Sequence, residues 1–130
     1  MSQIRLLMIL FFCHFLADYT SLCNTWMCKA KEFWTPLFPI FCHAWIHAIL
    51  MWLVLFVWSS GTWISWTIIL QLSLFQLITH FLIDILKGKI NYHFTSLRDV
   101  NSDWYRILFG LDQYLHIIVI LMMAYYYNLI

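Results

Sequence analysis

Apolar residues dominate four stretches of this chain, and most polar residues fall in the segments between them. The stretches cover about residues 3–19, 37–58, 62–86 and 104–127. A helix needs about 20 mostly apolar residues to cross a bilayer, so the first stretch spans only with little tilt or with residues 20–22 added. The pattern predicts an all-α fold, a four-helix transmembrane bundle in which residues 1–130 form a single integral membrane domain.

Local signals indicate where these helices begin and end. Pro36 and Pro39 come at the start of the second stretch and suit the first turn of a helix. A Ser-Ser-Gly break at residues 59–61 separates the second stretch from the third. Gly88 follows the third stretch, and we expect it to cap that helix. The polar residues 87–103 then form the loop before the fourth helix.

The composition favours a membrane protein. Hydrophobic residues make up 64% of the chain and charged residues only 10%, whereas a soluble domain carries about 25% charged residues. We therefore expect the lipid bilayer to surround the protein. The net charge of +1 comes without any basic run, so the sequence gives no sign of a nucleic-acid partner. The cysteines form no CxxC motif, and we interpret them as packing residues.

Basic residues predict the orientation of the helices. Those of the first and third loops are Lys29, Lys31, Lys87, Lys89 and Arg98. The other side of the membrane offers Arg5 and almost no further basic residue. Because cytoplasmic loops are enriched in Lys and Arg, we predict that these two loops are cytoplasmic and that both termini lie outside.

Titratable residues interrupt the apolar stretches in a regular way. They form four pairs whose members are four positions apart: His14/Asp18, His43/His47, His80/Asp84 and Asp112/His116. On an α-helix this spacing places both side chains of a pair on one face. Such groups are costly at membrane depth and usually turn toward the interior of a bundle or a water-filled cavity.

The depth of the four pairs predicts a single site. With a rise of about 1.5 Å per residue, every pair falls in the half of the membrane nearest the first and third loops. We therefore expect the eight residues to line one cavity that opens to the cytoplasmic side. Gln76 extends the polar face of the third helix by one turn, and Gln113 suits a supporting position. His93 lies in the polar third loop, where we expect it to be solvated.

Histidine and aspartate together are the donors that zinc, manganese and iron sites use. In helix bundles such sites are built from facing pairs at helical spacing. Eight donors exceed the four ligands of a closed zinc site, so two ions, or one ion with surplus acid/base groups, would use them. We expect a divalent metal, Zn or Mn, with all eight residues as candidate ligands and Asp84 and Asp112 also as catalytic candidates. Two ions about 3.5–4 Å apart would suit phosphoester hydrolysis.

Four motifs carry a resemblance to a known family. They are HFLADYT at residues 14–20, HAWIH at 43–47, THFLIDILKG at 79–88 and FGLDQYLH at 109–116. Together they resemble a bacterial integral-membrane family that is a domain of unknown function, and the match runs over about residues 4–125. More loosely, the pattern is similar to membrane-bound metal-dependent hydrolases. The resemblance implies a place in the bacterial inner membrane and roles for the eight residues as ligands or acid/base groups.

These observations favour a metal-dependent hydrolase that acts on a lipid or another membrane-accessible phosphoester. A metal-ion or proton carrier is the main alternative, although a carrier would favour access from both sides and helices broken in mid-membrane. A haem-binding bundle is a third possibility, with axial histidines paired across helices. The last is a non-catalytic membrane subunit or effector whose polar core serves assembly. The sequence leaves a homo-oligomer open.

Overall fold

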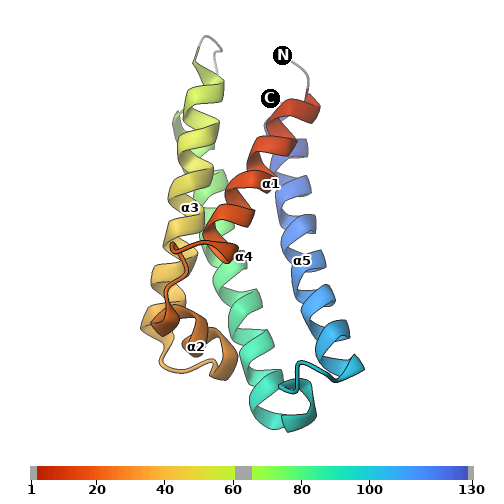
Figure 1. Ribbon diagram of the computed structural model, residues 1–130. Coiled ribbons are helices and arrows are strands. Elements are labelled where there is room, and N and C mark those ends of the chain that lie inside the picture. Colours follow the sequence, from red (N-terminus) through yellow and green to blue (C-terminus); the bar gives the residue numbers. More distant parts are fainter. Residues whose placement is uncertain (1–2, 61–65, 129–130) are drawn as a thin grey trace.

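The apolar stretches form helices in the computed structural model, which describes residues 3–60 and 66–128 (Figure 1). In chain order the elements are α1 (Gln3–Tyr19), α2 (Thr25–Phe33), α3 (Leu37–Ser59), α4 (Trp66–His93), the short 3-10 turn η1 (Thr95–Leu97) and α5 (Asp103–Asn128). The described residues contain no β-strand, so the predicted all-α class is confirmed. The expected start of the third helix at Thr62 lies outside the described residues.

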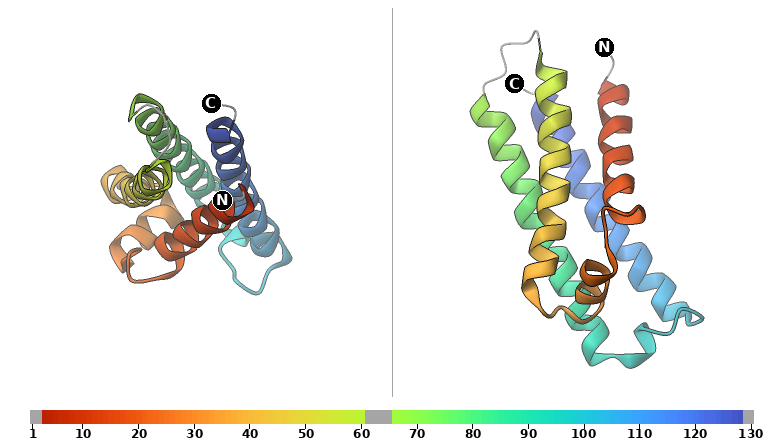
Figure 2. Two further views of the ribbon diagram at one scale, coloured as in Figure 1. Left: turned by 90° about the horizontal axis from the view of Figure 1, so that it is seen from above. Right: turned by 60° about the vertical axis from the view of Figure 1, so that its left-hand side comes forward.

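The long helices α1, α3, α4 and α5 run side by side, and the short α2 lies near one end (Figure 1). Both α3 and α5 pack against α1 and against α4. The first turn of α1 and the last turn of α5 lie at the same end of the molecule (Figure 2). The helix α2 and the turn η1 lie toward the opposite end, which we call the α2 end.

Among the described residues, three helices, α3, α4 and α5, are long and apolar enough to cross a membrane. The 17 residues of α1 give about 25 Å of helix, less than the hydrocarbon core of about 30 Å. This helix ends at Tyr19 without using residues 20–22, and α2 continues below it along α3 and α4 (Figure 1). The structure therefore supports a membrane protein with three spanning helices, whereas a spanning role for α1 stays a prediction.

The helix α2 is an element that the hydrophobic pattern did not predict. Asn24 caps its start, because the side-chain oxygen accepts a hydrogen bond from Met27 N at 3.0 Å. Met27 and Ala30 are buried, and the helix packs against α3 and α4. Its apolar face thus covers the interior at the level where α1 has already ended.

The helix α4 continues through Gly88 and ends at His93, so the expected cap at Gly88 is wrong. The glycine serves a close approach between two helices instead. A Cβ atom at this position would lie 2.6 Å from Trp34 N and 2.7 Å from Lys31 O. Only glycine lets α4 pack this close to the end of α2. The contact holds the backbone of Lys31 beside α4.

Apolar side chains fill the end of the molecule where α1 begins. Leu6, Leu10, Met51, Leu55 and Ile120 are completely buried there in one packed cluster. Many large apolar side chains on the outer faces of the helices remain exposed, which fits contact with lipid. The apolar cluster separates the polar residues of the interior from this end of the molecule.

Candidate metal centre

The eight site residues predicted from the sequence come together in the interior. They are His14 and Asp18 from α1, His43 and His47 from α3, His80 and Asp84 from α4, and Asp112 and His116 from α5. We call these eight residues the polar cluster. Their side chains are at most 7% exposed where they form ion pairs, and Asp84 is completely buried. The helical spacing thus turns both members of every pair inward, as predicted.

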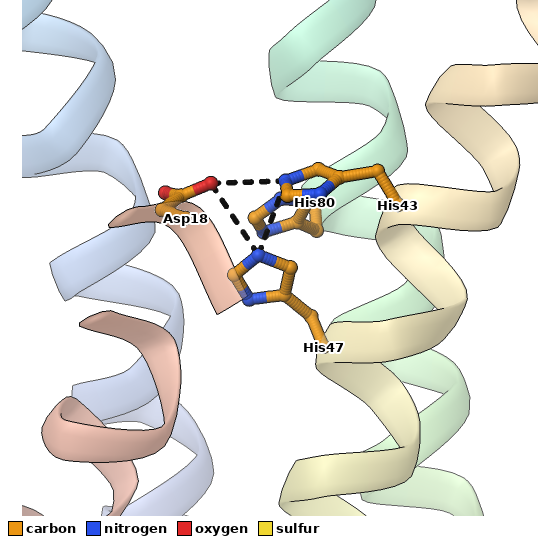
Figure 3. Close-up of side chains that lie close together, drawn as sticks. All are labelled: Asp18, His43, His47 and His80. Carbon is orange, nitrogen blue, oxygen red and sulfur yellow. Dashed lines mark hydrogen bonds and ion pairs between the residues drawn. The ribbon is translucent and has the colours of Figure 1, made fainter. Parts of the chain in front are cut away.

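Asp18 links α1 to the histidines of α3 and α4. Its Oδ1 atom lies 2.9 Å from His43 Nε2 and 3.5 Å from His47 Nε2 (Figure 3). The rings of His47 and His80 stack with 3.7 Å between their centroids. Donor atoms of these four residues lie within 4.8 Å of one another, close enough to approach a single metal ion. His14 joins them through a distance of 3.2 Å between its Nδ1 and that of His47.

Asp84 forms the centre of a second group of donors. Its Oδ2 atom lies 3.4 Å from His80 Nε2, and its Oδ1 atom lies 3.7 Å from His116 Nε2. The donor atoms of this group also lie within 4.8 Å of one another. Asp112 extends the group, with Oδ1 at 3.6 Å from His116 Nε2. Because His80 belongs to both groups, the polar cluster is one continuous site.

Lys31 enters the polar cluster from α2, which the sequence analysis did not anticipate. Its Nζ atom lies 2.8 Å from Asp18 Oδ1 and 3.5 Å from Asp84 Oδ2. The distance from Nζ to His43 Nε2 is 3.0 Å. Burial lowers the pKa of an ammonium group, but the carboxylates of Asp84 and Asp18 outweigh this effect and hold the pKa of Lys31 above its ordinary value. Lys31 is therefore a charged side chain among candidate metal ligands.

Lys87 pairs with the remaining carboxylate, with 2.7 Å between its Nζ and Asp112 Oδ2. The three buried carboxylates thus face two ammonium groups, and His116 lies within 4 Å of both Asp84 and Asp112. Buried charges are stable only when they are paired, so any further cation that enters must take over some of these contacts. Lys31 and Lys87 are two of the basic residues from which the orientation in the membrane was predicted. Both form ion pairs with buried carboxylates, so they are not free charges of a cytoplasmic loop.

Several buried polar atoms of the cluster make no hydrogen bond with any described residue. They include both ring nitrogens of His80 and of His116 and both carboxylate oxygens of Asp84. The amide of Gln76, one turn from His80, is also buried without a hydrogen bond in the described part of the chain. A buried polar group without a hydrogen bond costs about 1–3 kcal/mol. The contacts of Asp84 with Lys31, His80 and His116 are ion pairs at 3.4–3.7 Å, so a bound cation could still approach these atoms more closely.

A pocket of about 350 Å³ lies at the edge of the polar cluster, on the side of the α2 end. Among the eight cluster residues, Asp18 lines this pocket, together with the basic residues Lys31, Lys87 and Arg98. The other seven pack against one another behind it. The open cavity expected along all eight residues is therefore wrong, because imidazole rings and carboxylates fill the interior themselves.

Two cysteines line the same pocket, Cys23 just before α2 and Cys28 within it. The Sγ atoms of Cys23 and Cys28 lie 2.6 Å apart, a contact between residues five positions apart that form no CxxC motif. Burial, with a smaller effect from the hydrogen bond to Cys28, raises the pKa of the Cys23 thiol to about 12. A raised pKa makes this thiol a weaker nucleophile at neutral pH. Neither cysteine belongs to the two groups of candidate metal ligands described above.

The expectations for Gln113 and His93 are met in part. Gln113 lines the pocket, and its Nε2 donates a hydrogen bond to Asp112 Oδ2 at 3.2 Å, which suits a supporting position. His93 is exposed, although it belongs to the last turn of α4 and not to a loop.

A known protein family matches this chain. The family described as "Protein of unknown function (DUF3307)" matches residues 6–130, which is nearly the whole chain. No curated protein and no solved structure gives a significant match. The predicted resemblance to a family of unknown function is thus confirmed at the level of the family, and the looser resemblance to hydrolases stays a prediction.

Proposed function

The chain belongs to the DUF3307 family, and for this member we propose the function of a membrane-embedded metal-dependent hydrolase. A divalent ion, Zn or Mn, binds to the polar cluster and activates a water molecule against a phosphoester of a lipid or of another membrane-accessible substrate. In this proposal the protein lies in a bacterial inner membrane. The pocket faces the cytoplasm, and both termini lie outside.

One observation carries the proposal: imidazole and carboxylate groups from four helices converge in two overlapping groups of donors. Asp84 is the central ligand in this proposal, because it faces both His80 and His116. Asp112 lies further out and serves as the acid/base candidate. A bound metal lowers the pKa of its water to about 7 and so supplies a nucleophile at neutral pH. Asp18 connects the ion with the pocket, where the substrate would bind.

Lys31 and Lys87 support a second candidate function. Their ammonium groups already compensate two of the three carboxylates, as in a polar core that serves folding or assembly in a non-catalytic subunit. A metal-ion or proton carrier has less support, because the apolar cluster around Leu10, Met51 and Ile120 closes the path toward the other end of the molecule.

Hydrolysis assays on the full-length protein in detergent micelles test the proposal. Zinc or manganese should activate hydrolysis of a phosphoester such as p-nitrophenyl phosphate or a short-chain phosphatidic acid, and a chelator should abolish it. Asp84→Asn and His80→Ala should each lose activity by about 100-fold or more, since even groups that only support metal ligands contribute up to that factor. His93→Ala, which removes an exposed histidine, is the matched control. Hydrolysis that is absent in the metal-loaded protein, or insensitive to the chelator, would refute the proposal.

A further inference from the structure

Lys31 and Lys87 each face two different surroundings. On one side their ammonium groups contact carboxylates of the polar cluster, at 2.8 Å for Asp18 and 2.7 Å for Asp112. On the other side both residues line the pocket, where their side chains are 14% and 19% exposed. They are therefore the connection between the metal centre and the space in which a substrate would lie.

The ammonium group of Lys31 competes with a metal ion for the same donors. It lies within 3.5 Å of donor atoms of Asp18, His43 and Asp84, which come from three different helices. A metal ion held by Asp18, His43, His47 and His80 would bond two of these atoms at about 2.0–2.2 Å and would need nearly the same position. Since two cations so close together repel each other strongly, binding of the metal must move the ammonium group.

The pocket is the place to which a displaced ammonium group can move. The contact with Gly88 fixes the backbone of Lys31, but the four-carbon stem of a lysine leaves Nζ free to swing. Lys87 has the same two surroundings, because its ammonium group contacts Asp112 and its side chain lines the same pocket. Arg98 already lines this pocket, and its Nε is buried without a hydrogen bond to any described residue.

We propose that Lys31 and Lys87 are exchangeable counterions, which a divalent metal displaces from the carboxylates and which then, with Arg98, bind the phosphoryl group of the substrate in the pocket. The inference rests on the metal site of the proposed function and adds where and in what order the substrate binds. Without metal, the lysines are neutralised by Asp18, Asp84 and Asp112. With metal, three cationic side chains face the pocket, and Glu32 is the acidic lining residue that no metal neutralises. The metal must therefore bind before the anion.

Calorimetry on the full-length protein in detergent tests this order, with inorganic phosphate as the probe and zinc as the metal. The zinc-loaded protein should bind phosphate about tenfold more tightly, or better, than the chelator-treated protein, which is the scale of one charge-assisted hydrogen bond. Lys87→Gln should weaken phosphate binding to the zinc-loaded form by about the same factor while zinc binding stays equal or becomes tighter. Lys31→Gln should likewise weaken phosphate binding to the zinc-loaded form, while zinc binding stays equal or becomes tighter. Lys89→Gln, a charge change on an exposed neighbour in α4, is the control and should change neither affinity.

The outcomes separate this inference from the proposed function. A protein that takes up no zinc would refute both. The protein could take up zinc and still bind phosphate equally tightly without it, or bind phosphate unchanged in Lys87→Gln. Either result would overturn the inference but would leave the metal site of the proposed function intact. If dihexanoyl phosphatidic acid binds more tightly than inorganic phosphate and with the same dependence on zinc and Lys87, the phosphoryl group belongs to a lipid. Equal affinities would indicate a water-soluble phosphoester.

Discussion

A protonated lysine between buried carboxylates stabilises the metal-free protein. Lys31→Met should therefore lower the free energy of unfolding of the chelator-treated protein by about 3–5 kcal/mol, because it leaves Asp18 and Asp84 without their ammonium partner. Thermal or denaturant unfolding in detergent measures the change. Zinc should restore much of the lost stability, since the ion replaces the missing charge. Equal stability of the metal-free variant and the wild type would show that the pair does not stabilise the fold.

The raised pKa of Lys31 predicts how this contribution depends on pH. A group whose pKa is higher in the folded state contributes fully below its unfolded value, which is about 10.4 for lysine, and loses its contribution above that value. The difference in stability between wild type and Lys31→Met should thus stay constant from about pH 7 to pH 9 and shrink above pH 10.4. A difference that already shrinks near pH 7 would contradict the assignment.

At the scale of elements, the close packing of α2 on α4 depends on Gly88. An alanine there would place its Cβ against the backbone of Trp34 and Lys31, which cannot move aside as a side chain could. Gly88→Ala should therefore cost about 1–3 kcal/mol of stability, the usual range for overpacking. Gly110→Ala on α5 is the control, because a Cβ atom there meets no described atom within 4 Å and alanine favours the helix. If the unfolding temperature decreased by the same amount in both variants, this role of Gly88 would be contradicted.

The elements that the sequence predicted are the long apolar ones. Their length and composition determine α3, α4 and α5 with little help from the rest of the molecule. The helix α2 has only nine residues and a mixed surface, so no apolar stretch announces it, although Asn24 as a cap and the spacing of Met27 and Ala30 were available signals. The end of α4 was missed because the reason for Gly88 lies in α2, which is distant in sequence.

At the scale of the whole molecule, α1 begins and α5 ends at one end of the structure (Figure 2). We predict that both termini lie on the same side of the membrane, and outside. Reporter fusions at each terminus, with a periplasmic and a cytoplasmic reporter, check this directly. Termini on opposite sides would contradict the arrangement of the helices, whereas two cytoplasmic termini would contradict only the orientation.

The candidate site was predictable to the extent that it depends on single helices. Residues four positions apart share a face, and the cost of burying them in a membrane turns that face inward, so the members of the polar cluster could be named from the sequence. The lysines could not, since Lys31 and Lys87 reach the carboxylates only through contacts between different elements. The packed interior could not be predicted from the sequence either. Whether eight polar side chains line a cavity or fill it depends on the distances between helices.

The central claim is that the polar cluster binds a divalent metal ion, and the zinc content of the full-length protein tests it most directly. The protein is stripped with a chelator, dialysed against zinc and analysed for bound metal, as wild type and as Asp84→Asn and His80→Ala. Asp84→Asn keeps the shape of the side chain, removes its negative charge and leaves Lys31 paired with Asp18, so its metal-free unfolding temperature should change little.

We predict about one zinc ion or more per wild-type chain and a large loss of bound zinc in both variants. Wild-type protein without zinc, or zinc that stays unchanged in both variants while their stability falls, would contradict the account.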